Sequence, residues 1–140
     1  MGSRRKGRIL ALQALYSWEL NPGEIAQLND FPWVEEERNK NLAPDTAAFA
    51  RLIIGGTLEN LVEIDKKISE HLDHWDIKRL AKVDLSILRI SAYSLLFQKD
   101  IPFSVTIDEA IDIAKEYGSD DSYRFVNGVL DGIRKSENDV

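Results

Sequence analysis

The stretch RRKGRILALQALYSWEL, residues 4–20, decides the fold. Good helix formers dominate it, and on a helical wheel its apolar side chains face nearly every direction. Only Lys6, Gln13 and Ser17 line up as a narrow polar strip. A helix that is apolar almost all round is surrounded by neighbours. We therefore expect residues 4–20 to form a helix through the middle of the domain, with its basic end protruding.

Length and composition bound the remaining possibilities. The chain has 140 residues, of which 44% are hydrophobic and 30% are charged, as expected for one globular domain over residues 1–140. No apolar run is long enough to span a membrane. The absence of cysteine excludes disulfides, thiolate metal sites and cysteine nucleophiles, and it fits a reducing compartment. These features predict a cytoplasmic protein with no membrane partner.

Charge is distributed unevenly along the chain. Residues 4–8 carry four positive charges and no acid, whereas the whole chain has a net charge of −6, so the residues after them sum to −10. A small basic end on an acidic body can hold a polyanion locally while the remainder repels it. The alternative interpretation is a solvated, disordered N-terminal arm.

Helical spacing and capping signals continue to the end of the sequence and predict an all-α protein of about seven helices, with no strand. A Gly55-Gly56 pair inside the longest segment indicates a kink or a close helix crossing. The other segments have ordinary start and stop signals. In chain order we expect a short helix after Asn21-Pro22-Gly23-Glu24, a short helix within 35–41, a long helix capped by Asp45 and reaching about Leu72, a turn from Asp76 to Leu80, a helix from Val83 to Phe97, a helix begun by the capping box Thr106-Ile107-Asp108-Glu109 and ended by a left-handed Gly118, and a last helix from the cap Ser119 to near Lys135.

The two histidines are the first candidates for metal chemistry. His71 and His74 lie three residues apart at a predicted helix end, near Glu70 and Asp73. Two ligands at an exposed helix end are far more often solvated polar residues. The Glu-x-x-His repeat of di-iron bundles is absent, because Ile68 stands three residues before His71. We expect no metal and no cofactor.

Three carboxylates are the second candidates for chemistry. Asp108, Glu109 and Asp112 cluster near a predicted helix start, where the capping box and the helix dipole already explain them. The sequence holds no nucleophile elbow, Walker loop or dinucleotide fingerprint. We therefore expect no catalytic residue and no enzyme.

The segment over residues 117–131 combines aromatic rings, a cation and an amide near a helix start. Tyr117, Tyr123, Arg124 and Asn127 provide these groups. Rings stack on bases and arginine contacts phosphates in proteins that hold single-stranded RNA. Packing of the last helix explains other members of the segment, such as Val129, equally well.

Taken together, these segments resemble the NusB family of bacterial transcription antitermination factors. The resemblance covers nearly the whole chain except about residues 21–45. It is carried by Arg4-Arg5-Lys6-Gly7-Arg8 with Ala11-Leu12-Gln13-Ala14-Leu15-Tyr16, by Leu85-Ser86-Ile87-Leu88-Arg89-Ile90 with Tyr93, by Ile101-Pro102 before Thr106-Ile107-Asp108-Glu109-Ala110-Ile111, and by Phe125-Val126-Asn127-Gly128-Val129-Leu130-Asp131.

The resemblance implies two small helical bundles that share the first helix, in one RNA-binding domain over residues 1–140. It implies binding of the boxA element of ribosomal RNA leader transcripts together with the ribosomal protein NusE, within an RNA polymerase antitermination complex that includes other Nus factors. The RNA contacts it implies are Arg4, Arg5, Lys6 and Arg8, with Tyr117, Arg124, Phe125 and Asn127 as the second half of the surface. Positions that support or tune the assembly are Tyr16, Asp84 and Asp121.

Two departures from the family pattern concern the basic end. Lys6 stands where arginine is frequent, which loses bidentate geometry but keeps the charge. Gly7 replaces a helix former, so we expect this end to fray. Three or four phosphate contacts on single-stranded RNA predict a salt slope of about −2 to −3, and hence modest affinity without a partner.

Two other functions are compatible with such a domain. One is the NusB-like module that some ribosomal RNA methyltransferases carry, which the end of the chain at Val140 disfavours. The other is a helical adaptor that binds only proteins and whose basic arm is incidental.

Overall fold

The computed structural model describes residues 2–23, 25–73 and 76–138, and over these residues it is entirely helical. None of the helices in this part of the chain is long and apolar enough to cross a bilayer. The elements are α1 (Ser3–Leu20), α2 (Ile25–Leu28), α3 (Glu36–Lys40), α4 (Pro44–Glu59), α5 (Leu61–Glu70), the 3-10 turn η1 (Ile77–Arg79), α6 (Lys82–Phe97), α7 (Phe103–Tyr117) and α8 (Ser122–Asn138). The all-α prediction is confirmed.

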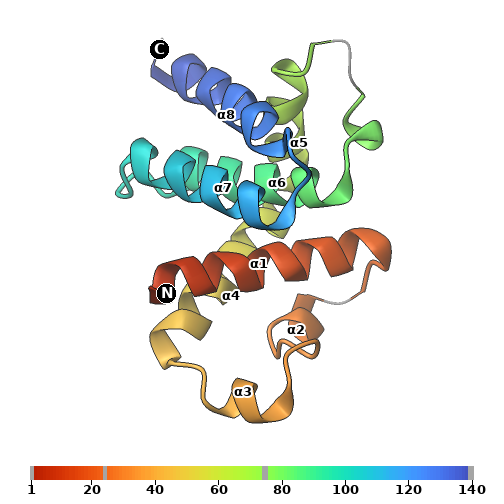
Figure 1. Ribbon diagram of the computed structural model, residues 1–140, viewed down its shortest axis with the longest axis vertical. Coiled ribbons are helices and arrows are strands. Elements are labelled where there is room, and N and C mark those ends of the chain that lie inside the picture. The colour runs from red at the N-terminus through yellow and green to blue at the C-terminus, as the bar shows by residue number, and fades with distance from the viewer. Residues whose placement is uncertain (1, 24, 74–75, 139–140) are drawn as a thin grey trace.

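Helix α1 runs across the middle of the molecule between two groups of helices (Figure 1). It packs against α4 on one side and α6 on the other. Helices α2, α3 and α4 lie on the first side, and α5 to α8 lie on the second (Figure 1). Nearly every residue from Gly7 to Leu15 is buried, so the prediction of a central first helix shared by two bundles is confirmed.

The basic end of α1 is helical from Ser3, contrary to the expected fraying. Gly7 is buried where α1 crosses α4, and a Cβ atom there would lie 2.8 Å from a ring carbon of Phe49. The glycine therefore permits a close helix crossing, and tertiary packing outweighs its low helix propensity.

The single long helix predicted from Asp45 to Leu72 is wrong, and this division adds one helix to the expected count. Pro44 occupies the first turn after Ala43, so Asp45 lies inside α4 and does not cap it. The chain leaves helical geometry at Asn60, whose side-chain amide donates to the carbonyl of Gly56 at 2.8 Å. Helix α5 then starts in a new direction at Leu61.

The Gly55-Gly56 pair marks a close crossing of α4 with α6. A Cβ atom on Gly56 would overlap the phenol ring of Tyr93, which is buried and stacked on Phe97. The space beside Gly55 is open. Of the two glycines, only Gly56 is required by packing.

These neighbouring glycines form a matched pair for a stability test. We expect Gly56→Ala to lower the free energy of unfolding by about 1–3 kcal/mol, because the methyl group overpacks the helix crossing. Gly55→Ala should raise it by about 0.5–1 kcal/mol through helix propensity alone. Urea denaturation of both variants checks this, and equal effects would contradict the assignment of the crossing to Gly56.

A buried arginine connects three helices on the other side of α1. The guanidinium of Arg89 on α6 donates to both carboxylate oxygens of Asp65 on α5, at 3.0 and 2.9 Å, and to Glu19 on α1 at 2.7 Å. Only 7% of the Arg89 side chain is exposed. Burial raises the pKa of Glu19, but the hydrogen bonds from Arg89 and Lys82 outweigh it, and the net pKa is lowered.

This network predicts how stability depends on pH. A carboxylate whose pKa is lowered by folding stabilises the protein above its ordinary pKa of about 4.5, and that stabilisation is lost as the pH falls through the folded value. Glu19→Gln should therefore cost about 1.5–3 kcal/mol at pH 7 and progressively less below pH 4.5. Urea unfolding at pH 7, 5, 4 and 3 measures the gap between the two proteins. A gap of constant size would show that the Glu19 charge is not involved.

Candidate nucleic-acid interface

The first turn of α1 presents cations at the positive end of a helix. Arg4 and Lys6 are exposed, and no acidic residue lies in this turn. The helix dipole places partial positive charge at the same end. The charges of the side chains and of the backbone therefore add, and together they make this end of the molecule attractive to an anion.

Two of the arginines lie on the same aromatic ring. The guanidinium carbons of Arg4 and Arg8 are 4.4 and 5.1 Å from the centre of the Phe49 ring on α4. Arg8 is only 6% exposed, and no described carboxylate lies within ion-pair distance of it. Burial lowers the pKa of Arg8, assisted by the neighbouring charges of Arg4 and Arg5. Arg8 remains a cation, but its head group is set back from the surface.

Arg5 holds α1 against α7. Its Nε lies 2.7 Å from a carboxylate oxygen of Glu109, and its Nη2 lies 2.6 Å from Asp112. These hydrogen bonds raise the pKa of Arg5 well above its ordinary range. The ion pair fixes the basic end of α1 beside one face of α7, and it leaves 32% of the Arg5 side chain exposed.

This contact corrects the predicted capping box. Helix α7 begins at Phe103 after Pro102, so Thr106 is a buried residue inside the helix and Glu109 is free to pair with Arg5. Pro102 precedes the helix with φ −56° and an extended ψ of 136°, and because it has no backbone N–H and disfavours helical geometry at Ile101, the helix cannot extend further back. Of the other two carboxylates considered for catalysis, Asp108 is exposed and Asp112 also pairs with Arg5.

The corner between α7 and α8 is tighter than expected. Gly118 has a φ of −93°, so the predicted left-handed stop is wrong. Its hydrogen side chain is required by space, because a Cβ atom would lie 2.5 Å from Ser122 and 2.8 Å from the carbonyl of Ala114. Ser122, rather than Ser119, begins α8, and its hydroxyl accepts the backbone N–H of Ser119 at 2.9 Å.

The first turn of α8 carries a cation–aromatic cluster. Arg124 donates from Nε to the hydroxyl of Tyr123 at 3.0 Å, and the guanidinium also lies over that ring. The ammonium of Lys115 lies 5.0 Å from the centre of the same ring. Asn127 is exposed, whereas Phe125 is partly buried against the core. The cluster therefore offers two cations, a ring and an amide to solvent.

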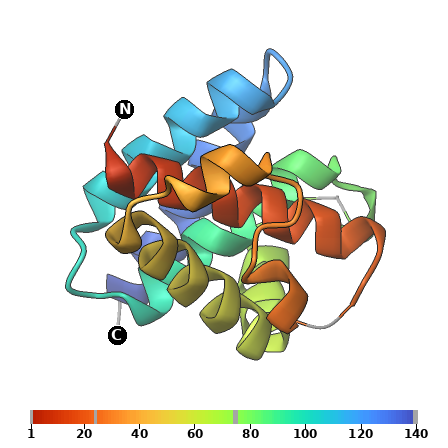
Figure 2. The ribbon, with the colours of Figure 1, turned by 90° about the horizontal axis from the view of Figure 1, so that it is seen from below.

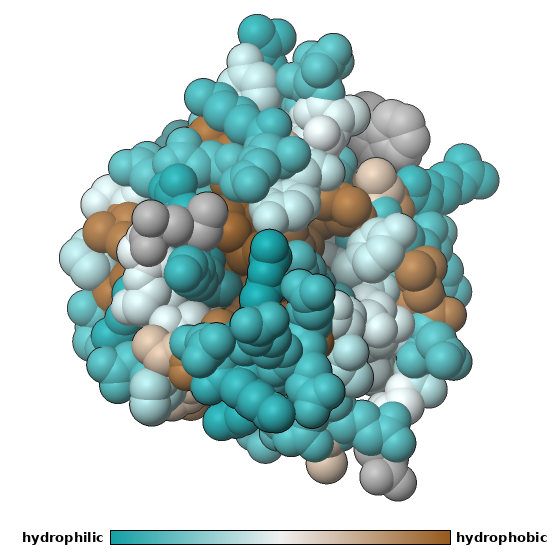
Figure 3. Space-filling model, turned by 60° about the horizontal axis from the view of Figure 1, so that its bottom comes forward, coloured by the Kyte–Doolittle hydropathy of each residue, from teal (hydrophilic) through white to brown (hydrophobic). Residues whose placement is uncertain are grey.

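A groove joins the basic end of α1 to the end of α7. It has a volume of about 1020 Å³, and its lining includes Lys6 and Gln13 from α1, Trp33 and Arg38 from the connection to α4, and Tyr117 from α7. The outer surface of the molecule is mainly hydrophilic, with apolar patches in its hollows (Figure 3). Lys6 and Tyr117, which are 111 positions apart in the sequence, thus face one cavity.

Three of the predicted modulating positions lie outside this groove. Tyr16 is exposed on the second half of α1. Asp84 lies in the first turn of α6 with one buried carboxylate oxygen that has no hydrogen-bond partner in the described chain. Asp121 is exposed immediately before α8 and lies 4.0 Å from the guanidinium of Arg124. Only Asp121 adjoins the cation–aromatic cluster.

The sequence did not identify residues 33–43 as part of the site. Nothing in this polar connection distinguishes it from an ordinary surface loop. The one available signal was the polar strip on α1, because Lys6 and Gln13 of that strip face the groove.

The histidine pair is only partly described. His71 packs against Gly132 of α8, and its Nε2 is buried without a hydrogen-bond partner in the described chain. His74 lies outside the described residues. Among the residues that are described, no group of three side chains suited to holding a metal ion comes together.

Comparisons with known proteins agree on one family. The model of the NusB family matches residues 5–135. The transcription antitermination protein NusB of Treponema pallidum (strain Nichols) is 54% identical over 133 residues, covering 95% of this chain and 93% of that protein.

Solved structures give the same result. A T. maritima NusB structure superposes with a TM-score of 0.84 at 42% identity, covering 94% of this chain and 90% of that one. A crystal structure of the antitermination factors NusB and NusE in complex with dsRNA has a TM-score of 0.84 at 31% identity, covering 97% of this chain and 98% of that one.

Proposed function

The chain belongs to the NusB family, and from that membership together with the geometry above we propose that it binds boxA RNA of ribosomal RNA leader transcripts jointly with NusE. It is a transcription antitermination factor and not an enzyme. In this role it joins RNA polymerase and other Nus factors in an antitermination complex in the cytoplasm. Residues 1–140 act as one RNA-binding domain.

The observation that carries the RNA-binding proposal is that residues from α1 and α7 face one groove. The exposed cations Arg4 and Lys6 lie at the positive end of α1, and Lys6 lines the same groove as Tyr117. Arg124 lies beyond this groove at the start of α8, over the ring of Tyr123, which also lies near Lys115 of α7. Cations beside exposed rings suit single-stranded RNA, in which unstacked bases and phosphates alternate.

The geometry divides the work among the eight RNA-binding positions that the family resemblance supplies. We assign direct phosphate contacts to Arg4, Lys6 and Arg124, whose side chains reach solvent. Arg5 and Arg8 contribute indirectly, through their positive electrostatic potential, because Arg5 is ion-paired and Arg8 is buried. Tyr117 and Asn127 face bases, and Phe125 supports them from its partly buried position.

The partner proposal follows from the charge of the remaining surface. The residues outside the basic end sum to −10, which complements a basic ribosomal protein and steers the two together. Tyr16, exposed on the second half of α1, and Asp84, partly exposed in the first turn of α6, are assigned to this contact. Asp121, beside Arg124, is assigned to tuning the RNA contact.

Fluorescence anisotropy tests the proposal directly. A labelled boxA RNA and a scrambled RNA of equal length are titrated with the protein at several salt concentrations, with and without NusE. We expect tighter binding to boxA when NusE is present, and a salt slope of about −2 to −3 for the protein alone. Equal binding to both RNAs that salt abolishes and NusE leaves unchanged would contradict the proposal and favour a protein-binding adaptor.

Removal of single cations separates direct from indirect contributions. Arg4→Gln and Lys6→Gln should each reduce the magnitude of the salt slope by about 0.7, because each removes one phosphate contact. Arg8→Gln should change the slope less, since its head group is buried.

The matched control for these variants is Lys66→Gln, which removes an exposed charge from α5, a helix outside the proposed RNA-binding surface. It alters the net charge equally and should leave the slope unchanged. If all four variants change the slope alike, the protein attracts RNA through its overall charge and not through the basic end of α1.

A further inference from the structure

Two of the three residues of the polar strip on α1, Lys6 and Gln13, have no role in the core and face the groove instead. Helix α1 is otherwise buried on nearly every side, yet Lys6 is exposed and Gln13 is half-buried among the lining residues. Apolar side chains of Ile9 and Leu10 complete the floor between them. The floor is held in place, because it is one face of a helix that packs against both α4 and α6.

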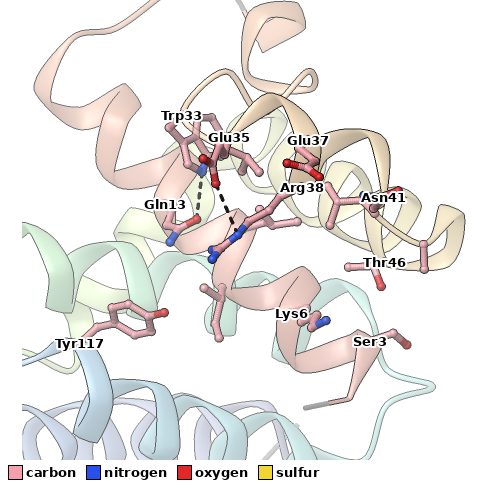
Figure 4. Close-up of a pocket in the computed structure, with 15 residues that line it drawn as sticks. Ser3, Lys6, Gln13, Trp33, Glu35, Glu37, Arg38, Asn41, Thr46 and Tyr117 are labelled. Carbon is pink, nitrogen blue, oxygen red and sulfur yellow. Dashed lines mark hydrogen bonds and ion pairs between the residues drawn. The ribbon is translucent and has the colours of Figure 1, made fainter.

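The amide of Gln13 is oriented by its neighbour. The indole Nε1 of Trp33 donates to the side-chain oxygen of Gln13 at 2.9 Å. Since an indole nitrogen is only a donor, this bond fixes which end of the amide carries the oxygen. The –NH₂ group of Gln13 is left pointing away from Trp33 (Figure 4). A pair of N–H donors thus lies at a fixed position on the groove floor.

The walls of the groove add a cation and a ring. Arg38 on α3 extends its guanidinium toward the floor, and the ring of Tyr117 stands on the opposite side (Figure 4). Tyr117 is 39% exposed. Arg38 lies 3.7 Å from Glu35, and both side chains are more than three-quarters exposed, so a phosphate can replace that weak ion pair.

We propose that this groove binds one or two nucleotides of single-stranded RNA, with Gln13 as a base-reading residue. A base stacks on Tyr117 and accepts hydrogen bonds from the Gln13 amide, while Lys6 and Arg38 contact the flanking phosphates. This inference rests on the proposed function and extends it, because phosphate contacts alone carry no base information. A volume of about 1020 Å³ is sufficient for more than one nucleotide.

RNA fits the groove better than a protein segment does. Lys6, Gln13 and Arg38 offer donors toward the interior, and bases and phosphates are rich in acceptors. The groove also continues without interruption from the Lys6 and Tyr117 contacts assigned above. The carboxylates of Glu35 and Glu37 belong to the wall formed by the connection and α3, opposite Tyr117.

The fluorescence of Trp33 reports directly on occupation of the groove. The sequence contains two other tryptophans, so Trp18→Phe combined with Trp75→Phe leaves Trp33 as the only one. Titration with boxA RNA should change the emission of Trp33 with the same midpoint as the anisotropy. RNA that binds by anisotropy without changing the Trp33 signal would overturn the inference. So would a response to NusE alone that RNA does not reproduce, because the occupant would then be protein.

Substitution of Gln13 tests base reading. Gln13→Glu keeps the oxygen that Trp33 requires but replaces the donor pair with a charged acceptor, and we expect affinity for boxA RNA to fall at least tenfold. Ser17→Glu is the matched control, since it adds the same charge to the same strip of α1 outside the groove. It should change affinity less than twofold. Equal effects of the two variants would overturn the assignment.

A second pair tests the wall. Arg38→Gln should weaken RNA binding about fivefold, whereas Lys40→Gln, which removes a charge from the same short helix outside the groove, should not. Unfolding curves of all variants identify any loss of fold. If the unsubstituted protein does not bind RNA at all, the proposed function fails. If it binds normally and Gln13→Glu and Arg38→Gln bind equally well, only the groove inference fails.

Discussion

Burial of α1 on two sides is the constraint on which the rest of the structure depends. Helices α4 and α6 both pack against it, and α4 crosses closely at Gly7, where the ring of Phe49 occupies the place of a side chain. A helix clamped in this way cannot tilt without opening both bundles. Its first turn and its polar strip are therefore held between the neighbouring helices (Figure 2), and Arg4, Lys6 and Gln13 project from this one helix.

At the basic end of α1, the number of cations in the sequence overestimates the number of side chains that can contact RNA. The sequence contains four cations within five residues and does not distinguish between them. In the structure one is buried on Phe49, one is ion-paired to α7, and two reach solvent. Because the coupling of binding to salt depends on phosphate contacts, we expect Arg4 and Lys6 to contribute more to the salt dependence than Arg5 and Arg8 do.

Much of the fold could be predicted from the sequence, because apolar periodicity records burial directly. The central first helix and the all-α class follow from that pattern alone. Helix starts were predicted less well. Asp45 and Glu109 both satisfy capping rules, but Pro44 and Pro102 begin the helices earlier, and Glu109 is used in a tertiary ion pair. Local sequence signals cannot reveal that Glu109 pairs with Arg5, because the two residues lie 104 positions apart.

The candidate site could be predicted only in part, for a related reason. The cations and the aromatic segment near the C-terminus are visible as residue types, whereas the placement of Tyr117 in one groove with Lys6 depends on the contact of α7 with the start of α1. The groove was not predictable at all, because the polar strip indicates that something other than core faces Gln13 without indicating what. The answer is the connection that carries Trp33, and this segment has no distinctive pattern.

The ion pair between Arg5 and α7 has two opposite effects on RNA binding. Glu109 and Asp112 withdraw one cation from the RNA, which lowers the attraction that the basic end can exert. The same contact holds α7 against the start of α1, so that Tyr117 and Lys6 face one groove before RNA arrives. Preorganisation of this kind reduces the entropy that binding must overcome, while fewer free charges reduce binding to unrelated RNA. A protein built in this way exchanges affinity for selectivity, and a partner that adds contacts then completes a tight complex.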